Sequence, residues 1–247
     1  MLDTNVLLVF AAALVTALAT GLGALPFLLV RHISDWWISI ANAVAAGLML
    51  AASHSLIAEG VELEPGRTLL GMLLGLGAII AGQILVSNHS ARDISSLSGL
   101  DAKKAVLIIG VMTAHSFAEG IGVGVSFGGS SELATFITAA IAVHNIPEGL
   151  AIALVLIPRG ASVLQAAKWS VFSSLPQPLM AVPAFLFVTA FQPWLPVGLG
   201  FAAGAMVWMV FAELWPDATE HASPHAAATT LVLSFVAFAA FQEFLLK

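Results

Sequence analysis

The amino-acid sequence predicts an all-α polytopic membrane protein with eight transmembrane helices. Hydrophobic residues make up 60% of the 247 residues and charged residues only 9%, against about a quarter charged in soluble domains. Apolar runs recur along the chain, each near the ~20 helical residues that cross a hydrocarbon layer of about 30 Å. The runs lack the alternation of apolar and polar residues that marks a membrane barrel, so we expect helices.

The expected spans follow one another through the whole chain. They cover residues 5–30, 37–58, 68–87, 105–127, 133–157, 162–190, 195–215 and 226–246. The longest polar connection, residues 88–104, is expected to be a cytoplasmic loop or a short helix. No segment outside the spans is long enough for a second unit, so residues 1–247 are expected to form a single transmembrane domain.

Lysine and arginine positions predict the orientation. With the N-terminus outside, six basic residues fall in cytoplasmic connections, namely Arg31, Arg92, Lys103, Lys104, Arg159 and Lys168. Only Arg67 and Lys247 then lie outside, and the positive-inside rule therefore favours both termini outside. We expect an integral protein of the cell (inner) membrane. There is no cysteine and no basic cluster, which excludes thiolate metal sites and gives no sign of nucleic-acid binding.

Proline and glycine mark special helices. Pro176, Pro178 and Pro183 interrupt the sixth span, which predicts a kinked or locally unwound helix. Small residues also recur at helix-packing spacing, which predicts close helix–helix approach in lipid. These are Gly71-x3-Gly75, Gly120-x-Gly122-x-Gly124 and Gly200-x3-Gly204.

Two spans carry the same polar insertion. Residues 115–120 read His-Ser-Phe-Ala-Glu-Gly and residues 144–149 read His-Asn-Ile-Pro-Glu-Gly. The histidine and glutamate of each copy are four residues apart, which places both side chains on one face of a helix. Each histidine lies about 15 Å deep at ~1.5 Å per residue, so both pairs are expected in one layer near the bilayer midplane, and Gln177 of the sixth span with them.

Imidazole and carboxylate groups together suit zinc and other first-row divalent ions. His115, Glu119, His144 and Glu148 are sufficient for a complete set of ligands. Ser116 and Asn145, each beside its histidine, are expected to line an adjoining site or to support the ligands. A single intramembrane histidine is often only hydrogen-bonded and a single glutamate only protonated, but two matched copies at one depth favour a metal site.

The two insertions resemble the signature helices of the ZIP (Zrt/Irt-like) family of divalent metal transporters, in which H-[NS]-x-x-E-G is followed by H/Q-[ND]-x-P-E-G. The resemblance implies zinc uptake toward the cytoplasm by alternating access, with Fe²⁺, Mn²⁺ or Cd²⁺ as other possible substrates. It implies a 3+2+3 helix arrangement, in which spans 1–3 and 6–8 form an inverted repeat around metal-bearing helices at about 105–127 and 133–157. It assigns His115, Glu119, His144 and Glu148 to the primary site.

The resemblance also implies a second, adjacent site with contributions from Ser116, Asn145 and the bridging glutamates. Here the chain departs from the family pattern. Many members have glutamate in a Ser-Gly-x-x-Glu-Pro context of the sixth span, whereas this chain has Gln177. The loss of a carboxylate weakens an all-oxygen site, so we expect one well-occupied metal position.

Two further residues are weaker candidates. Glu213, in an E-L-x-P ending of the seventh span that resembles the family's, either receives the ion on exit or caps a helix end. His54 of the second span either collects cations from outside or has no such role. Expected partners are a divalent ion and the lipid bilayer, without nucleic acid, and a homodimer is possible.

Two other classes of protein bury similar residues. An intramembrane metal-dependent hydrolase needs an open coordination position and a general base, but the H-E-x-x-H pattern is missing and no base is left over. A di-metal redox bundle uses glutamate and histidine three residues apart, whereas here histidine comes first at a spacing of four. The repeated ligand pair therefore favours a carrier over an enzyme.

Overall fold

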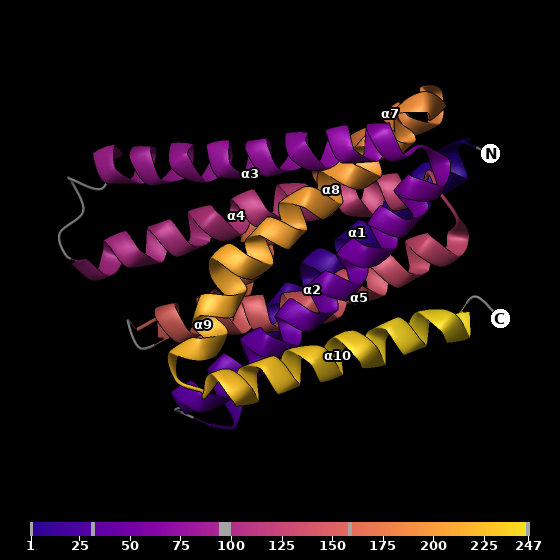
Figure 1. The fold of residues 1–247 in the computed structure, drawn as a ribbon. Coiled ribbons are helices and arrows are strands. Elements are labelled where there is room, and N and C mark those ends of the chain that lie inside the picture. Colours follow the sequence, from indigo (N-terminus) through magenta and orange to yellow (C-terminus); the bar gives the residue numbers. More distant parts are fainter. Residues whose placement is uncertain (1, 31–32, 94–99, 158–159, 246–247) are drawn as a thin grey trace.

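The computed structural model describes residues 2–30, 33–93, 100–157 and 160–245, and it consists of helices in those ranges (Figure 1). The α-helices are α1 (Leu2–Leu22), α2 (Asp35–Leu63), α3 (Pro65–Asp93), α4 (Leu100–Ser126), α5 (Ser131–Leu156), α6 (Val163–Ser174), α7 (Pro176–Ala190), α8 (Leu195–Met209), α9 (Trp215–Glu220) and α10 (Pro224–Leu245). Short 3₁₀ segments cover Leu25–Leu28 and Gln192–Trp194, and a π-helical turn covers Val210–Leu214.

The helices form the eight predicted spans. The pair α6–α7 makes the sixth span, and α8, the π turn and α9 make the seventh. Seven of the spans are long and apolar enough to cross a membrane by length and composition within the described residues, and the 27-residue α4 completes the eight. The expected connection 88–104 is shorter than predicted, because α3 continues to Asp93 and α4 begins at Leu100; residues 94–99 lie outside the described ranges.

The predicted break in the sixth span is confirmed at Leu175, between α6 and α7. Pro176 is the first residue of α7, where its missing N–H costs no helical hydrogen bond. The seventh span has a comparable irregularity, since the π turn ends just before Trp215-Pro216. Such single π turns inside helices are frequent at functional sites.

Contacts between helices repeat under one exchange of spans. In this exchange, spans 1, 2 and 3 correspond to spans 6, 7 and 8, and span 4 corresponds to span 5. The packing of α1 on α5 then corresponds to the packing of α7 on α4. The same exchange turns α3 on α8 into α10 on α2, and α2 on α5 into α8 on α4. Exchanged spans run in opposite directions along an up-and-down chain, so the contacts have the pattern of an inverted repeat around α4 and α5.

Glycine-mediated contacts divide the bundle into two groups of helices. A Cβ atom on Gly149 would lie 1.7 Å from the Thr20 carbonyl oxygen, and one on Gly124 would lie 2.2 Å from that of Ala181. These contacts join α5 to α1 and α4 to α7. Equally close backbone contacts join α3 to α8 at Gly71 and Gly204, as the glycine spacing predicted. We call α1, α4, α5, α6 and α7 the first group, and α2, α3, α8, the π turn, α9 and α10 the second.

Several hydrogen bonds between helices stay within one group. In the first group, Thr20 bonds Ser174 across α1 and α6 at 2.8 Å. In the second group, Ser39 of α2 donates to the Asp217 carbonyl of α9 at 2.8 Å, and Ser55 of α2 donates to Gln242 of α10 at 2.6 Å. Each group is therefore held together by both backbone proximity and polar contacts.

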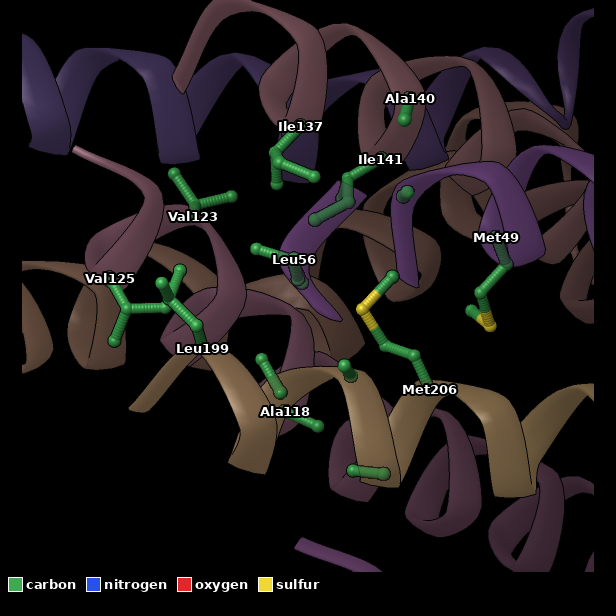
Figure 2. Packing of buried hydrophobic residues seen from close by; sticks show 14 of the residues in the cluster. Met49, Leu56, Ala118, Val123, Val125, Ile137, Ala140, Ile141, Leu199 and Met206 are labelled. Atoms are coloured by element: carbon green, nitrogen blue, oxygen red, sulfur yellow. The ribbon is translucent and has the colours of Figure 1, made fainter. Parts of the chain in front are cut away.

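Aliphatic side chains fill the boundary between the groups. Figure 2 shows Leu56 of α2 and Met206 of α8 near Ile141 of α5, and Met49 and Ile137 belong to the same buried cluster. In lipid, such burial gains little from water exclusion and depends on close packing instead. Large apolar side chains are meanwhile exposed on the outer surface, for example Leu69, Leu179 and Leu233.

Candidate metal site

The two histidine–glutamate pairs lie on neighbouring helices of the first group. His115 and Glu119 are on α4, and His144 and Glu148 are on α5, and each of the four residues is buried. The spacing of four keeps each pair on one helical face, as the sequence predicted. Pro147 lies inside α5 directly before Glu148 and leaves the Val143 carbonyl without its helical donor.

Three of these side chains converge closely. The Nε2 atom of His144 lies 3.2 Å from Oε1 of Glu119 and 3.1 Å from Oε1 of Glu148. One potential ligand atom from each of these three residues lies within 4.8 Å of the other two. Ligand atoms of a tetrahedral zinc lie roughly 3.3 Å apart, given bond lengths near 2.0–2.1 Å, so the spacing suits an ion of that size.

His115 adjoins this trio from one side. Its Nδ1 atom lies 3.6 Å from Oε1 of Glu148, and its Nε2 atom lies 2.8 Å from Oε2 of Glu213 in the π turn. Glu148 therefore stands between the two histidines. Glu213 comes from the second group, and its side chain is 19% exposed whereas the other four are at most 2% exposed.

Gln177 contacts the trio from the other side. Its Nε2 donates to Oε2 of Glu119 at 2.6 Å. Its Oε1 accepts from the Thr16 hydroxyl at 2.6 Å and from Nδ2 of Asn145 at 3.2 Å. Asn145 also donates to the Thr16 backbone carbonyl at 2.8 Å. The residue that stands in the place of a glutamate is thus part of a hydrogen-bonded network with Glu119.

The glycine at the end of each insertion is required because there is no space for a side chain at that position. A Cβ atom on Gly120 would lie 2.5 Å from the Gln177 carbonyl oxygen, and one on Gly149 would lie 1.7 Å from that of Thr20. Each glycine follows a site glutamate, and each allows a second helix backbone to approach beside that carboxylate. The E-G pairing therefore brings α7 and α1 against the site.

Of the remaining candidate residues, only some contact the cluster. Asn145 joins the Gln177 network, while Ser116 is buried but donates to the Met112 carbonyl of its own helix at 3.0 Å. His54 is exposed on α2 and packs against Phe235, with ring centroids 6.3 Å apart, so it lies apart from the cluster. Thr16 was not predicted, because its partners are 129 and 161 residues away and a threonine in an apolar span gives no signal.

Several buried polar atoms of the cluster lack a hydrogen-bond partner. They are Oε1 of Glu119, Oε2 of Glu148, Oδ1 of Asn145, and Nδ1 of His115 and of His144. Buried polar atoms are normally paired, and an exception of this kind in a cluster of imidazole and carboxylate groups is consistent with a role in binding an ion. Two carboxylates also carry a charge that is costly in hydrocarbon and that a divalent cation neutralises.

Fold and site together define a helical membrane protein with a buried cluster of imidazole and carboxylate groups suited to a divalent ion. A family model described as "ZIP Zinc transporter" matches residues 85–241, which is more than half of the chain. The chain belongs to this family. It is accordingly an integral membrane protein of a transporter family rather than an enzyme, and the intramembrane hydrolase is not favoured.

Individual relatives agree with this assignment. The chain is 32% identical over 242 residues to zinc transporter GufA of Myxococcus xanthus, covering 91% of this chain and 94% of GufA. It is 32% identical over 235 residues to zinc transporter ZIPB of Bordetella bronchiseptica, covering 87% and 73%. It is 49% identical over 224 residues to a proposed zinc transporter of Arabidopsis thaliana, covering 90% of this chain but only 36% of that longer protein.

Proposed function

We propose that this chain carries Zn²⁺ across the membrane toward the cytoplasm, through a site formed by Glu119, His144, Glu148 and His115. The observation that carries the proposal is the convergence of Glu119, His144 and Glu148, whose ligand atoms lie within 4.8 Å of one another. Their mixed nitrogen and oxygen character matches zinc, and the relatives GufA and ZIPB are described as zinc transporters.

Movement of the ion follows from the two groups of helices. Apart from Glu213, the site residues belong to the first group, and the boundary with the second group consists largely of aliphatic side chains. We propose that the first group shifts against the second as a rigid body, so that the site faces each side of the membrane in turn. The backbone contacts at Gly124 and Gly149 keep the ligands in one unit during such a shift.

The direction and location of transport rest on charge distribution. We propose that both termini lie outside, that the site is near the bilayer midplane, and that the protein occupies the cell membrane. In this orientation the end of the seventh span faces the cytoplasm, and Glu213, in the π turn near that end, is the partly exposed carboxylate of the cluster. A homodimer stays a prediction.

The number of ions follows from Gln177. A carboxamide is neutral and binds hard cations less strongly than a carboxylate, and here its oxygen already accepts two hydrogen bonds. We therefore propose one tightly held ion. Affinity alone does not separate divalent metals at a histidine–carboxylate site, so Fe²⁺, Mn²⁺ and Cd²⁺ are the competitors to test against Zn²⁺.

Zinc flux into proteoliposomes tests the proposal. We expect His144→Ala and Glu119→Ala to lose at least about 90% of the initial uptake rate, because each removes a buried ligand. The matched control is His221→Ala, which removes an exposed histidine far along the chain from both insertions. Uptake at the wild-type rate by the His144 and Glu119 variants would contradict the site assignment.

A further inference from the structure

We propose that Thr16 is a positioning residue of the metal site, acting on Glu119 through Gln177. This inference rests on the proposed function, because it assumes that Glu119 binds the ion. Thr16 lies on α1, is fully buried, and contacts both other members of the network, Asn145 and Gln177. It has no place in the two insertions that carry the ligands.

The direction of the hydrogen bonds is determined from one end of the network. The Thr16 backbone carbonyl can only accept, so the group of Asn145 that faces it at 2.8 Å is the amide nitrogen. The same nitrogen lies 3.2 Å from Gln177, which must therefore present its oxygen. The amide nitrogen of Gln177 is then directed at Glu119, whose Oε2 accepts at 2.6 Å.

The Thr16 hydroxyl strengthens this orientation. It lies 2.6 Å from Oε1 of Gln177 and 2.7 Å from the Ala13 carbonyl, so one proton serves two acceptors in a three-centre arrangement. With two donors on its oxygen, the Gln177 amide cannot rotate by half a turn without placing its nitrogen against Asn145. Thr16 thus holds the amide from a helix that contributes no ligand.

The consequence for Glu119 is a fixed carboxylate. Its Oε2 is occupied by Gln177, and its Oε1 points to His144 at 3.2 Å and lacks a hydrogen-bond donor. One oxygen is therefore anchored and the other is free for the ion. Without the Thr16 hydroxyl, the amide gains rotational freedom and the ligand oxygen loses its fixed direction.

Close backbone packing holds the helices of this network in place. The Thr20 carbonyl, one turn after Thr16 on α1, meets Gly149 on α5 at backbone contact distance. Gln177 is the second residue of α7, directly after the break at Leu175, and its own backbone meets Gly120. These contacts join α1 to α5 and α7 to α4, which are the four helices that carry the network and Glu119.

The test is a mutant cycle on the full-length, purified protein, with zinc affinity measured by calorimetry and uptake in proteoliposomes. We expect Thr16→Val and Thr16→Ala to raise the zinc dissociation constant and KM by up to about tenfold, which is the scale of one buried hydrogen bond between neutral groups. The maximal rate should stay within about twofold, and Thr16→Ser should restore wild-type affinity.

The cycle with Gln177→Ala separates positioning from general stability. If Thr16 acts through Gln177, then Thr16→Val has no further effect on affinity in the Gln177→Ala background. An equal effect in both backgrounds, wild-type affinity in both Thr16 variants, or failure of Thr16→Ser to restore binding overturns the proposal. Should one Thr16 variant not fold, the other decides the result.

Controls on the ligands distinguish this inference from the proposed function. Loss of binding in Glu119→Ala together with wild-type binding in the Thr16 variants refutes only the role of Thr16. Wild-type binding in Glu119→Ala refutes the site itself, and the role of Thr16 with it.

Discussion

His115 and Glu213 join the two groups of helices, with Nε2 of the histidine 2.8 Å from Oε2 of the carboxylate. His115 lies on α4 of the first group, and Glu213 lies in the π turn of the second. His115 is expected to bind the ion, and in this structure it already contacts a carboxylate of the other group. Alternating access requires the two groups to shift against each other, so this contact has to change during transport.

Replacement of Glu213 tests the link between this contact and transport. We expect Glu213→Gln to lower the maximal rate of zinc uptake by about tenfold, or ~1.4 kcal/mol in the barrier. The reason is that the substitution removes the carboxylate that is expected to receive the ion after His115. Zinc binding at equilibrium should change by less than about threefold, since Glu119, His144 and Glu148 remain. Stopped-flow uptake and calorimetry measure the two quantities, with the exposed Glu220→Gln as the control. An unchanged rate would assign Glu213 to helix capping.

Conversion of Gln177 to glutamate tests the number of ions. A carboxylate at this position would face Oε2 of Glu119, where the amide nitrogen now lies at 2.6 Å. Like charges at that distance repel in a buried site, and a second cation relieves the repulsion. We expect bound zinc to rise from one to two ions per chain in Gln177→Glu, measured by elemental analysis, and to stay at one in the exposed Gln192→Glu control. One ion in both variants would contradict this reading of Gln177.

Alanine at the glycine of the second insertion should damage both folding and transport. In Gly149→Ala the new methyl group meets the Thr20 backbone 1.7 Å away, and backbone atoms cannot move aside cheaply. We expect a loss of stability of about 1–3 kcal/mol or more and a strong loss of zinc uptake. Gly77→Ala in α3 is the matched control, because nothing lies within 4 Å of its Cβ position; it should be neutral or stabilise by up to about 1 kcal/mol. Thermal unfolding in detergent compares the two, and equal midpoints would refute the close α1–α5 contact.

Acidification should weaken zinc binding. His115 and His144 bind metal only without a proton on the ligating nitrogen, so protons and zinc compete for the same atoms. We expect the zinc dissociation constant to rise as the pH falls and binding to release protons, which calorimetry in buffers of different ionisation enthalpy can count. The number released should fall in His144→Ala. A dissociation constant independent of pH would exclude the histidines as ligands.

The sequence by itself determined the helical membrane fold, the eight spans, the break at the prolines of the sixth span and the two histidine–glutamate pairs that we propose as ligands. These follow from local rules: an apolar run of sufficient length, a proline without its N–H, and a spacing of four that keeps His115 and Glu119 or His144 and Glu148 on one helical face. The ends of the helices were less predictable, since polar residues beyond the bilayer extend α3 and α4 without changing the apolar pattern.

Only the tertiary structure decided which polar residues meet. Thr16 and Asn145 are 129 residues apart, and Glu213 reaches His115 from another group of helices through a π turn. His54 has the same side chain as two of the proposed ligands but lies exposed beside Phe235. A single sequence contains no information on the rotation of one helix about another, and that rotation is set by packing at sites such as Gly149 and Gly120. The direction of each buried polar side chain follows from this packing, and with it the place of Gln177 as a support for Glu119.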